Sequence, residues 1–337
     1  MRILTVNTGS TSTKVDLVDG GRSTRLTMDD ALADSAPDAI AHRVVHGGDR
    51  TAVVIVDDTV RDELETLVEL APLHQRPALV VIDRCRQAWP GVPNVACFDT
   101  AFHATIPVAA RAYALPPPWR ERVRQYGFHG LSYAWATARV REQAPSADRI
   151  VIAHLGGGAS LCGVRQGRSV FTTMGFTPLD GLVMATRPGS IDPGAVLYLQ
   201  RHAPDVGALL ERSAGLVGLC GTDDMREVRR RIDNGDAEAG FAFAVWRHRL
   251  VALLGACIAA LEGIDALVFT GGIGEHDAPA RAAVAEAFEW LGVHLDPARN
   301  DRHESVISAP DSAIKVVVVE SREDLQMADE AAAVLAP

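Results

Sequence analysis

Two copies of one local pattern constrain the fold of this 337-residue chain more than any other feature. Residues 2–6 are an apolar run that leads into Asn7-Thr-Gly-Ser-Thr-Ser-Thr-Lys14, and residues 149–155 lead in the same way into Gly156-Gly-Gly-Ala-Ser160. A second apolar stretch follows each turn, so each copy predicts a strand, a glycine-rich turn and another strand. Dinucleotide folds and P-loops instead place a helix after their glycine loop. The pair therefore predicts a duplicated domain that binds phosphate between its copies, with two unrelated hairpins of an α/β protein as the alternative.

Helix-like and strand-like patterns alternate along the rest of the chain, which predicts an α/β fold of packed layers. The expected helices cover residues 58–70, 78–88, 132–143, 193–200, 237–261, 279–290 and 322–335. The expected strands cover residues 95–98, 266–270 and 314–319, and residues 271–274 are expected to form a turn. Asp192 precedes a proline at a favourable capping position for the helix that begins there.

The composition excludes several classes of protein. The chain carries 33 Lys and Arg against 43 Asp and Glu, a net charge of −10, so it is a poor candidate for binding nucleic acid. Its five cysteines include no C-x-x-C pair and are expected to be buried, reduced thiols. The longest apolar stretch, residues 250–261, is shorter than the roughly 20 residues that cross a bilayer. We expect a cytoplasmic protein that binds neither membrane nor nucleic acid.

Several polar residues stand at the ends of predicted segments, where functional side chains gather. Arg43 lies beside two glycines and Arg187 lies in a proline-containing turn, and a pair of arginines suits transfer of a phosphoryl group, although most arginines are solvated surface residues. Asp99 ends an apolar strand and Glu323 follows another, so both are candidates for binding Mg²⁺ through oxygen. A first-turn acid of a helix is an equally good interpretation of Glu323.

Nine motifs, taken in order, resemble those of the acetate and propionate kinase family, a branch of the actin-like ATPase superfamily. They are Asn7-Thr-Gly-Ser-Thr-Ser-Thr-Lys14, His42-Arg-Val-Val-His-Gly-Gly48, Pro72-Leu-His74, Phe98-Asp-Thr-Ala-Phe-His103, Tyr126-Gly-Phe-His-Gly130, His154-Leu-Gly-Gly-Gly-Ala-Ser160, Met174-Gly-Phe-Thr-Pro-Leu-Asp-Gly-Leu182, Thr186-Arg-Pro-Gly-Ser-Ile-Asp-Pro193 and Phe269-Thr-Gly-Gly-Ile-Gly-Glu275. The resemblance runs from residue 1 to about residue 335. It implies two ribonuclease-H-like (actin-like ATPase) domains with a cleft between them.

The resemblance also implies an activity. ATP and acetate would give ADP and acetyl phosphate reversibly, with the substrate carboxylate attacking the γ-phosphorus directly. The implied metal is Mg²⁺, with Mn²⁺ as an alternative, and its implied ligands are Asn7, Asp99 and Glu323. Arg43 and Arg187 would orient the carboxylate and offset phosphoryl charge, His129 would donate a hydrogen bond to the phosphoryl group, and His74 would play a secondary part. Both histidines are expected to lie in short loops.

The substrate and nucleotide residues come from the same resemblance. The implied apolar pocket for the alkyl end of the substrate is Val45, Leu73, Phe128 and Pro178. The implied phosphate and nucleoside contacts are Ser12, Lys14, His154, Gly156, Gly158, Asp224, Met225, Arg226, Gly271, Gly272, Ile273 and Gly274. Residues 1–99 with 324–337 would form the first domain, and residues 100–323 the second domain, which would bind the nucleotide and form a homodimer.

The chain also departs from the family pattern. Gly157 replaces a usual asparagine, Ser190 and Phe171 replace aspartates, Tyr133 replaces a histidine, His276 replaces an asparagine, and the stretch from Lys14 to His42 is shortened. These changes bear on nucleotide affinity and on the preferred phosphoryl donor. Two alternatives therefore stand beside an acetate kinase, namely a propionate kinase and a nucleotide-binding regulatory protein without kinase activity.

Overall fold

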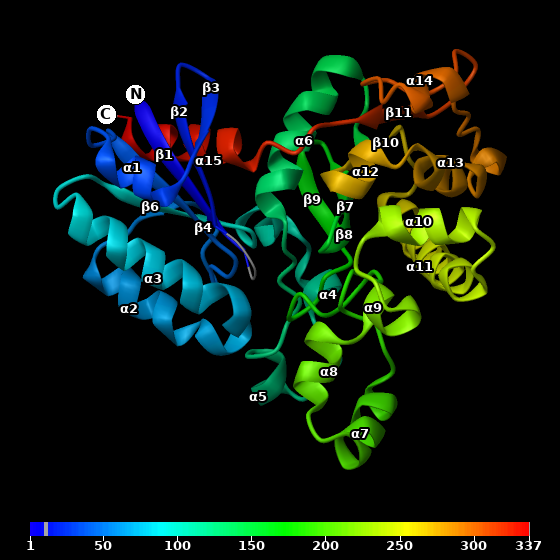
Figure 1. The fold of residues 1–337 in the computed structure, drawn as a ribbon, viewed down its shortest axis with the longest axis horizontal. Coiled ribbons are helices and arrows are strands. Elements are labelled where there is room, and N and C mark those ends of the chain that lie inside the picture. The colour runs from blue at the N-terminus through cyan, green and yellow to red at the C-terminus, as the bar shows by residue number, and fades with distance from the viewer. Residues whose placement is uncertain (10–12, 337) are drawn as a thin grey trace. The chain divides into compact units, whose positions relative to one another are not determined.

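The computed structural model describes residues 1–9 and 13–336, which form two compact units (Figure 1). Unit 1 comprises Met1–Thr105, Gly127–Trp135 and Arg322–Pro337, and unit 2 comprises Ile106–Tyr126 and Ala136–Ser321. Residues 127–135 group with unit 1, where the backbone N–H of Gly130 donates to the carbonyl of Asp99 over 2.9 Å. The domain boundaries expected at residues 99 and 323 stay a prediction. The expected phosphate contact of Ser12 lies outside the described residues.

Unit 1 is built on a six-stranded sheet in the order β3-β2-β1-β4-β6-β5. Its strands are β1 (Arg2–Thr8), β2 (Thr13–Asp19), β3 (Arg22–Leu26), β4 (Ala39–Val44), β5 (Val54–Ile55) and β6 (Asn94–Phe98). The first three strands pair antiparallel, and β4 and β6 continue the sheet in parallel with β1. The predicted first hairpin is thus confirmed for its described residues, with Asn7 opposite Lys14.

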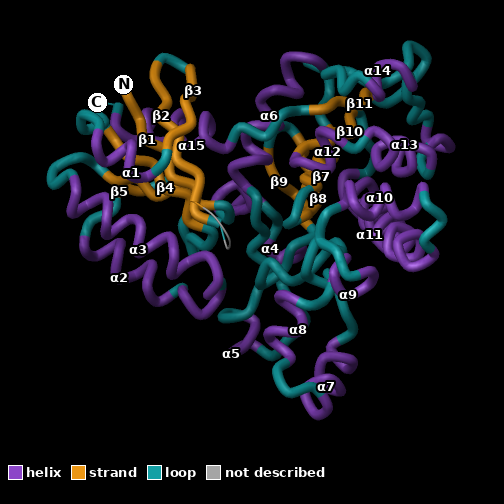
Figure 2. Tube along the Cα trace, in the orientation of Figure 1, coloured by secondary structure: helices purple, strands orange, loops and turns teal. Residues whose placement is uncertain are grey.

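Helices cover both faces of this sheet (Figures 1 and 2). The helical segments of unit 1 are α1 (Met28–Ala33), α2 (Asp58–Thr66), η1 (Val68–Leu70), α3 (Pro72–Ala88), η2 (Ala101–Thr105), the start of α6 (Gly130–Gln143) and α15 (Glu323–Leu335). Successive side chains of β1 point to opposite faces of the sheet, so the core of unit 1 has a part on each face. Ile3 packs with Met327 of α15 on one face, whereas Leu4 packs with Cys85 of α3 on the other.

Unit 2 repeats the architecture of unit 1. Its sheet has the order β11-β10-β7-β8-β9, with β7 (Arg149–Leu155), β8 (Ala159–Arg165), β9 (Arg168–Thr172), β10 (Ala266–Thr270) and β11 (Lys315–Val318). β7, β8 and β9 form an antiparallel meander, and β10 and β11 add in parallel to β7, as β4 and β6 add to β1. The shared strand order confirms the duplicated α/β fold that the two glycine hairpins predict.

The helices of unit 2 lie mostly in two long insertions between strands. They are α4 (Val108–Arg111), α5 (Pro117–Arg120), the remainder of α6, α7 (Pro193–His202), α8 (Val206–Arg212), α9 (Gly215–Cys220), α10 (Met225–Asp233), α11 (Ala237–Leu261), α12 (Gly271–His276), α13 (Ala278–Glu286), η3 (Glu289–Leu291) and α14 (Pro297–Asp301). Asp192 caps α7 as predicted, accepting from the N–H of Gly194 over 2.8 Å.

One described helix, α11, is long and apolar enough by length and composition to cross a membrane. The apolar stretch considered from the sequence covered only its second half. In unit 2, however, α11 buries one continuous face, whose residues recur every three or four positions. They are Ala239, Ala242, Trp246, Leu250, Leu254, Cys257 and Leu261. This pattern is that of a helix packed on a protein core.

Three predicted segments differ from the structure. Residues 271–274 do not form a simple turn, because they begin helix α12. Helix α3 starts at Pro72, six residues before the predicted start, since Pro72 occupies a first-turn position and the helix accommodates Pro77. Helix α13 ends at Glu286, and its predicted last turn is the separate 3-10 segment η3.

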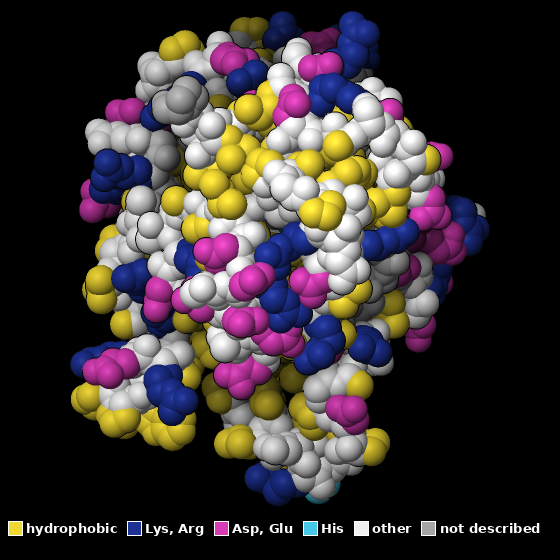
Figure 3. Space-filling model, turned by 90° about the vertical axis from the view of Figure 1, so that its left-hand side faces the viewer, with side chains coloured by type: hydrophobic (Ala, Val, Ile, Leu, Met, Phe, Trp, Pro, Cys, Tyr) yellow, Lys and Arg dark blue, Asp and Glu magenta, His cyan; other side chains and the backbone are white. Residues whose placement is uncertain are grey.

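The five cysteines are free and buried, as predicted. Several charged surface residues pair with one another, as Arg84 does with Asp29 over 3.0 Å and Arg86 with Asp58 over 2.6 Å. Figure 3 shows basic and acidic side chains intermixed on the face that it draws.

Candidate active site

Four polar side chains meet in unit 1 and form the Arg43 cluster, which we define as Asn7, Arg43, Asp99 and Glu323. The guanidinium of Arg43 donates from Nε to Oδ1 of Asp99 over 3.0 Å and from Nη2 to Oδ2 over 2.6 Å. Its Nη1 donates to Oδ1 of Asn7 over 3.1 Å and lies 3.7 Å from Oε2 of Glu323. Asn7 donates to Glu323 over 2.7 Å. The forked geometry of arginine thus joins an amide and two carboxylates.

The strand order explains why these residues meet. Asn7 lies near the end of β1, Arg43 near the end of β4, and Asp99 directly after β6. These three strands are neighbours and run in parallel, so their carboxyl ends lie at one edge of the sheet. Glu323 opens α15, where it also occupies the favourable first turn of a helix.

Burial and charge oppose each other in the cluster. Asp99 is only 1 % exposed, and burial together with the negative charge of Glu323 raises the pKa of its carboxyl group against the effect of Arg43. Burial lowers the pKa of the Arg43 guanidinium, but the charges of Asp99 and Glu323 outweigh it and hold that pKa above its ordinary value. Arg43 therefore stays charged, and its charge is what keeps two close carboxylates compatible.

Phe128 and His129, which the resemblance predicts to be site residues, lie next to this cluster. The backbone N–H of His129 bonds to Asp99, and His129 adopts the left-handed conformation with φ of 60°, which is uncommon outside glycine. Phe128 is buried, its carbonyl accepts from Nε2 of His103 over 2.9 Å, and its ring contacts His46 edge-on at 5.7 Å. Burial lowers the pKa of His103 to about 4, so this ring is neutral.

The other predicted residues of unit 1 surround the loop after β4. Val45 is buried in this loop, and Leu73 and His74 stand in the first turn of α3. His74 is therefore not a loop residue as predicted. Gln75 links that turn to the loop through two hydrogen bonds with the backbone of His46. The side chain of Gln75 accepts from the N–H of His46 over 3.2 Å and donates to the carbonyl of His46 over 3.0 Å. Lys14 is exposed on β2.

In unit 2, two glycine segments lie at the ends of neighbouring parallel strands. The turn Gly156–Gly158 follows β7, and helix α12 follows β10. Gly271 has φ of 76°, and a side chain there would meet the backbone of Leu155. A Cβ on Gly156 would lie 3.9 Å from the N–H of Gly272. Glycines at positions 156, 158, 271, 272 and 274 place no side chain over the backbone of these two segments, as a backbone phosphate site requires.

Arg187 and Pro178 are brought together in unit 2, since Nη1 of Arg187 donates to the carbonyl of Pro178 over 2.7 Å. Burial lowers the pKa of Arg187 from its ordinary value. The backbone around Arg187 is held by α9, because Gly215 has φ of 60° and approaches Met184 and Arg187 too closely for any side chain. The carbonyl of Gly157 accepts from Ala185 over 3.1 Å, which joins this segment to the glycine turn after β7.

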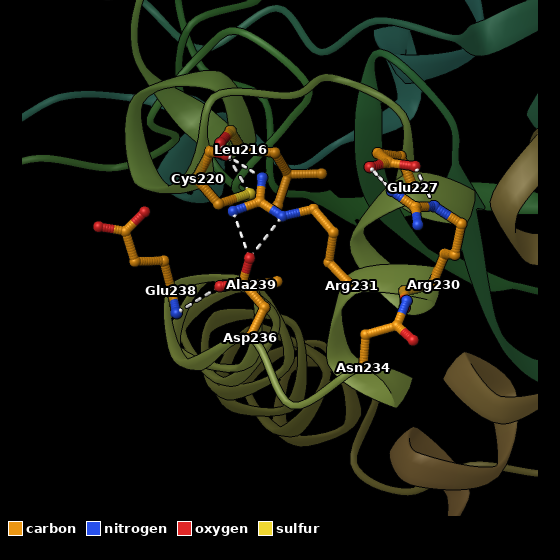
Figure 4. Close-up of polar contacts among 9 residues, drawn as sticks. All are labelled: Leu216, Cys220, Glu227, Arg230, Arg231, Asn234, Asp236, Glu238 and Ala239. Carbon is orange, nitrogen blue, oxygen red and sulfur yellow. Dashed lines mark hydrogen bonds and ion pairs between the residues drawn. The ribbon is translucent and has the colours of Figure 1, made fainter.

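Asp224, Met225 and Arg226 form the start of α10. Asp224 caps the helix and pairs with the exposed Arg226, with Nη2 to Oδ2 at 2.8 Å. Figure 4 shows what holds the other end of α10, where Arg231 binds the carbonyl of Cys220 and, over 2.7 Å, the carboxylate of Asp236, the capping residue of α11. Arg229 links α10 to the residue that follows α12, with its Nε 3.3 Å from Oδ2 of Asp277.

Sequence reasoning missed Gln75 and Thr100, which orient the loop after β4. The hydroxyl of Thr100 accepts from Gly47 over 3.1 Å, and Gln75 is fully buried. Thr100 lies within the motif of residues 98–103, but no local pattern gives either residue this role, because their partners are backbone groups that only the folded chain brings near.

The Arg43 cluster contains oxygen atoms of the kind that bind a magnesium ion. Mg²⁺ binds through one or two carboxylates and keeps several waters, and Asp99, Glu323 and the amide oxygen of Asn7 supply such donors. Among the described residues, no group of three or more His, Cys, Asp and Glu side chains could hold a metal. A divalent cation would offset the repulsion between Asp99 and Glu323 in the way that Arg43 does.

Replacing Arg43 with methionine should lower the free energy of unfolding by roughly 3–5 kcal/mol at about pH 8, because a buried carboxylate loses its partner. The loss should shrink toward about pH 5, where Asp99 takes up a proton in the folded state more readily than in the unfolded state. Urea titrations at both pH values measure this.

Arg61→Met is the control, because Arg61 forms an accessible pair with Asp83 over 3.0 Å, and such pairs contribute about 1 kcal/mol or less. The double variant Arg43→Met/Asp99→Asn should recover part of the loss. A double variant less stable than Arg43→Met would contradict this account of the cluster.

Comparison with known proteins gives one consistent family. The family model for the acetokinase family matches residues 26–329. The chain is 44% identical over 316 residues to acetate kinase of Streptomyces avermitilis, covering 89% of this chain and 78% of that protein. It is 47% identical over 314 residues to acetate kinase of Methylocella silvestris, covering 90% and 77%.

Two solved structures share the whole architecture. A propionate kinase from Francisella tularensis superposes with a TM-score of 0.92 and 32% identity, covering 98% of each chain. Acetate kinase of Porphyromonas gingivalis superposes with a TM-score of 0.89 and 30% identity, covering 99% of this chain and 100% of that one. From its sequence and its duplicated fold, the chain belongs to the acetokinase family.

Proposed function

We propose that this enzyme transfers the γ-phosphoryl group of ATP reversibly to acetate, giving ADP and acetyl phosphate. The observation that carries this proposal is the Arg43 cluster, where a buried guanidinium lies between two carboxylates at the carboxyl ends of parallel strands. Family membership supplies the reaction class, and the cluster supplies the charges that the class requires.

Phosphoryl transfer requires positioning and charge stabilisation more than a protein nucleophile. The carboxylate of acetate is itself the nucleophile in this proposal. Arg43 and Arg187 would orient it and offset negative charge on the equatorial oxygens, and His129 would donate a hydrogen bond to the phosphoryl group. Preformed donors of this kind stabilise charge that develops in the transition state.

Mg²⁺, or Mn²⁺ in its place, is the proposed metal, held by Asp99 and Glu323 directly or through water with Asn7 beside it. The ion would neutralise phosphate charge when bound. In unit 1, both carboxylates already lie in one polar cluster, since Arg43 binds Asp99 and Asn7 binds Glu323.

The apolar residues Val45, Leu73, Phe128 and Pro178 are proposed to receive the methyl group of acetate. One methylene changes binding in such a pocket by only about 1–3 kcal/mol. Propionate is therefore the second candidate substrate, favoured by the high structural similarity to a propionate kinase. His74, in the first turn of α3, is proposed as a secondary residue of this site.

Unit 2 is proposed to bind the nucleotide. The phosphates would bind the backbone of Gly156, Gly158 and Gly271–Gly274 beside His154, and the nucleoside would lie against Asp224, Met225 and Arg226. Lys14 and Ser12 would add phosphate contacts from the hairpin of unit 1. A cytoplasmic location is also proposed, since ATP is available there.

Incubation of the protein with MgATP, acetate and hydroxylamine should produce acyl hydroxamate, measured as its coloured ferric complex. Propionate should also give product, at a lower kcat/KM. If acetate, propionate and butyrate all fail under conditions where calorimetry detects nucleotide binding, the kinase proposal is wrong and the chain is a nucleotide-binding regulatory protein.

Arg187→Ala should lower kcat by about 10²–10³-fold, because one charge-stabilising donor is removed. The circular dichroism spectrum should be unchanged. Arg168→Ala, at an exposed position on β9, is the matched control and should keep normal activity. Near-normal turnover of Arg187→Ala would remove Arg187 from the site.

A homodimer through α11 is also proposed. The side of α11 opposite its buried face exposes small and apolar residues, among them Phe241, Ala244, Ala252 and Ala256. Phe241 is 61% exposed, and burying its ring in an interface would be favourable. Light scattering should therefore give twice the chain mass of 36.0 kDa. Phe241→Glu should give monomers. Trp290→Glu, at another exposed aromatic residue, should not change the mass. A monomeric wild-type protein would refute the proposal.

A further inference from the structure

The largest fully buried side chain in the described structure is that of a charged residue, Arg281 of α13. Burial lowers the pKa of its guanidinium, with the charges of Asp277 and Asp301 acting in the opposite direction. Among the described residues, no carboxylate lies within ion-pair distance of it. A buried cation without a paired anion is costly unless its hydrogen bonds are complete.

All five N–H donors of Arg281 have acceptors. Nη1 donates to the carbonyls of Gly274 over 2.9 Å and Glu275 over 2.8 Å. Nε and Nη2 donate to Asn300, to Oδ1 over 2.8 Å and to the carbonyl over 2.7 Å. The second Nη2 donor faces Nδ1 of His303 at 2.9 Å. The complete set of acceptors explains why a guanidinium is tolerated in this position.

Two of these acceptors belong to helix α12, which begins with Gly271 and Gly272. A helix of six residues is too short to be stable alone, and its last carbonyls have no partner within the helix. Arg281 supplies the missing donors from the interior. Asn300 completes the arrangement by donating to the carbonyl of Ala278, at the start of α13, over 2.9 Å.

We propose that Arg281 is a positioning residue for nucleotide binding: its guanidinium fixes the backbone of residues 271–275, so that their N–H groups are already placed when the nucleotide phosphates arrive. This inference rests on the proposed assignment of residues 271–274 to the nucleotide site. Arg281 itself touches no ligand in this account. A lysine could not replace it, because an ammonium group lacks the planar fork that reaches acceptors on three sides.

The contact with His303 makes the arrangement sensitive to pH. Nδ1 can accept from Arg281 only when the imidazole is neutral with its proton on Nε2. The groups that face His303 are Arg281 of α13, His276 of α12, whose ring contacts it edge-on at 6.1 Å, Asp277 and Asp301. Desolvation, together with the charges of Arg281 and His276, lowers the pKa of His303 from its ordinary value against the two aspartates.

Because this pKa is lowered, the arrangement is intact at neutral pH and is weakened as pH falls below the ordinary histidine value of about 6.5. Protonation would replace the acceptor at Nδ1 with a donor that faces another donor. Nucleotide affinity should then decrease at acidic pH through His303.

The test measures MgADP affinity by calorimetry, and KM for ATP and for acetate in the hydroxamate assay. Arg281→Lys should raise Kd for MgADP and KM for ATP by about tenfold, since at least one strong hydrogen bond is lost, while KM for acetate changes less than about twofold. Arg247→Lys is the matched control. Arg247 also binds α13, through the carbonyl of Ala283 over 2.7 Å and the carboxylate of Glu286 over 3.5 Å, and neither partner belongs to α12.

His303→Asn supplies a second variant that does not depend on the buried charge. Asparagine tolerates the positive φ of 53° at this position and retains an acceptor that does not titrate. Between about pH 7.5 and 5.5, Kd for MgADP should rise more steeply in the wild type than in His303→Asn. Protonation of the nucleotide itself is common to both proteins and cancels in the comparison.

The outcomes separate the two proposals. If KM for ATP and KM for acetate rise together in Arg281→Lys, or if Arg281→Lys behaves like Arg247→Lys, Arg281 has only a general structural role and this inference is wrong. Identical pH profiles for the wild type and His303→Asn would overturn the part assigned to His303.

A wild-type protein that binds MgADP but makes no acyl phosphate would refute the proposed function alone, because calorimetry still tests Arg281. A wild type that binds no nucleotide would overturn both proposals.

Discussion

The ion pair between Arg43 and Asp99 is the interaction on which the candidate chemistry of unit 1 depends. It joins β4 to the end of β6, and through Asn7 and Glu323 it also includes β1 and α15. These residues come from the beginning, the first third and the end of the chain. Two carboxylates at such close range repel each other, and the guanidinium compensates for that repulsion while leaving their oxygens together. The same charges that stabilise the folded unit are therefore those that a phosphoryl-transfer site requires.

Unit 2 has the same strand order as unit 1, but its candidate site residues are of a different kind. Its candidate phosphate-binding segments consist of backbone rather than charged side chains, so their position depends on close approach between main chains. Gly271 packs on the backbone of Leu155, and Gly215 packs on Met184 and Arg187, with no room for a side chain at either glycine. The arginines Arg229 and Arg231 hold the helices around these segments by their carboxylate and carbonyl partners. Among the candidate site residues, unit 1 thus contributes the Arg43 cluster, whereas unit 2 contributes Arg187 and glycine-rich backbone segments.

Much of the secondary structure and the duplication of the fold could be predicted from the sequence. The two glycine hairpins follow from local turn chemistry and from β-favouring residues on both sides, so the duplication was readable before any contact was known. The long helix of residues 237–261 has a periodic buried face and was placed correctly. Residues 271–274 were interpreted as a turn because glycines disfavour helices, whereas Arg281 supplies the donors that let α12 form. His74 was interpreted as a loop residue because Pro72 and Pro77 obscure the start of α3.

The sequence by itself determined the alternation of elements, the repeat, the family resemblance and the candidate residue types, because these depend on local propensity and on motif order. Local pattern alone could not separate Arg43 from the many solvated arginines, although the family resemblance singled it out. It did not reveal Gln75 or Arg281, because their contacts depend on partners far away in the chain. Only the tertiary structure decided these, by bringing the ends of parallel strands to one edge and by burying guanidinium groups where every donor must find an acceptor. Long-range burial, which no local pattern encodes, gave these polar residues their defined contacts.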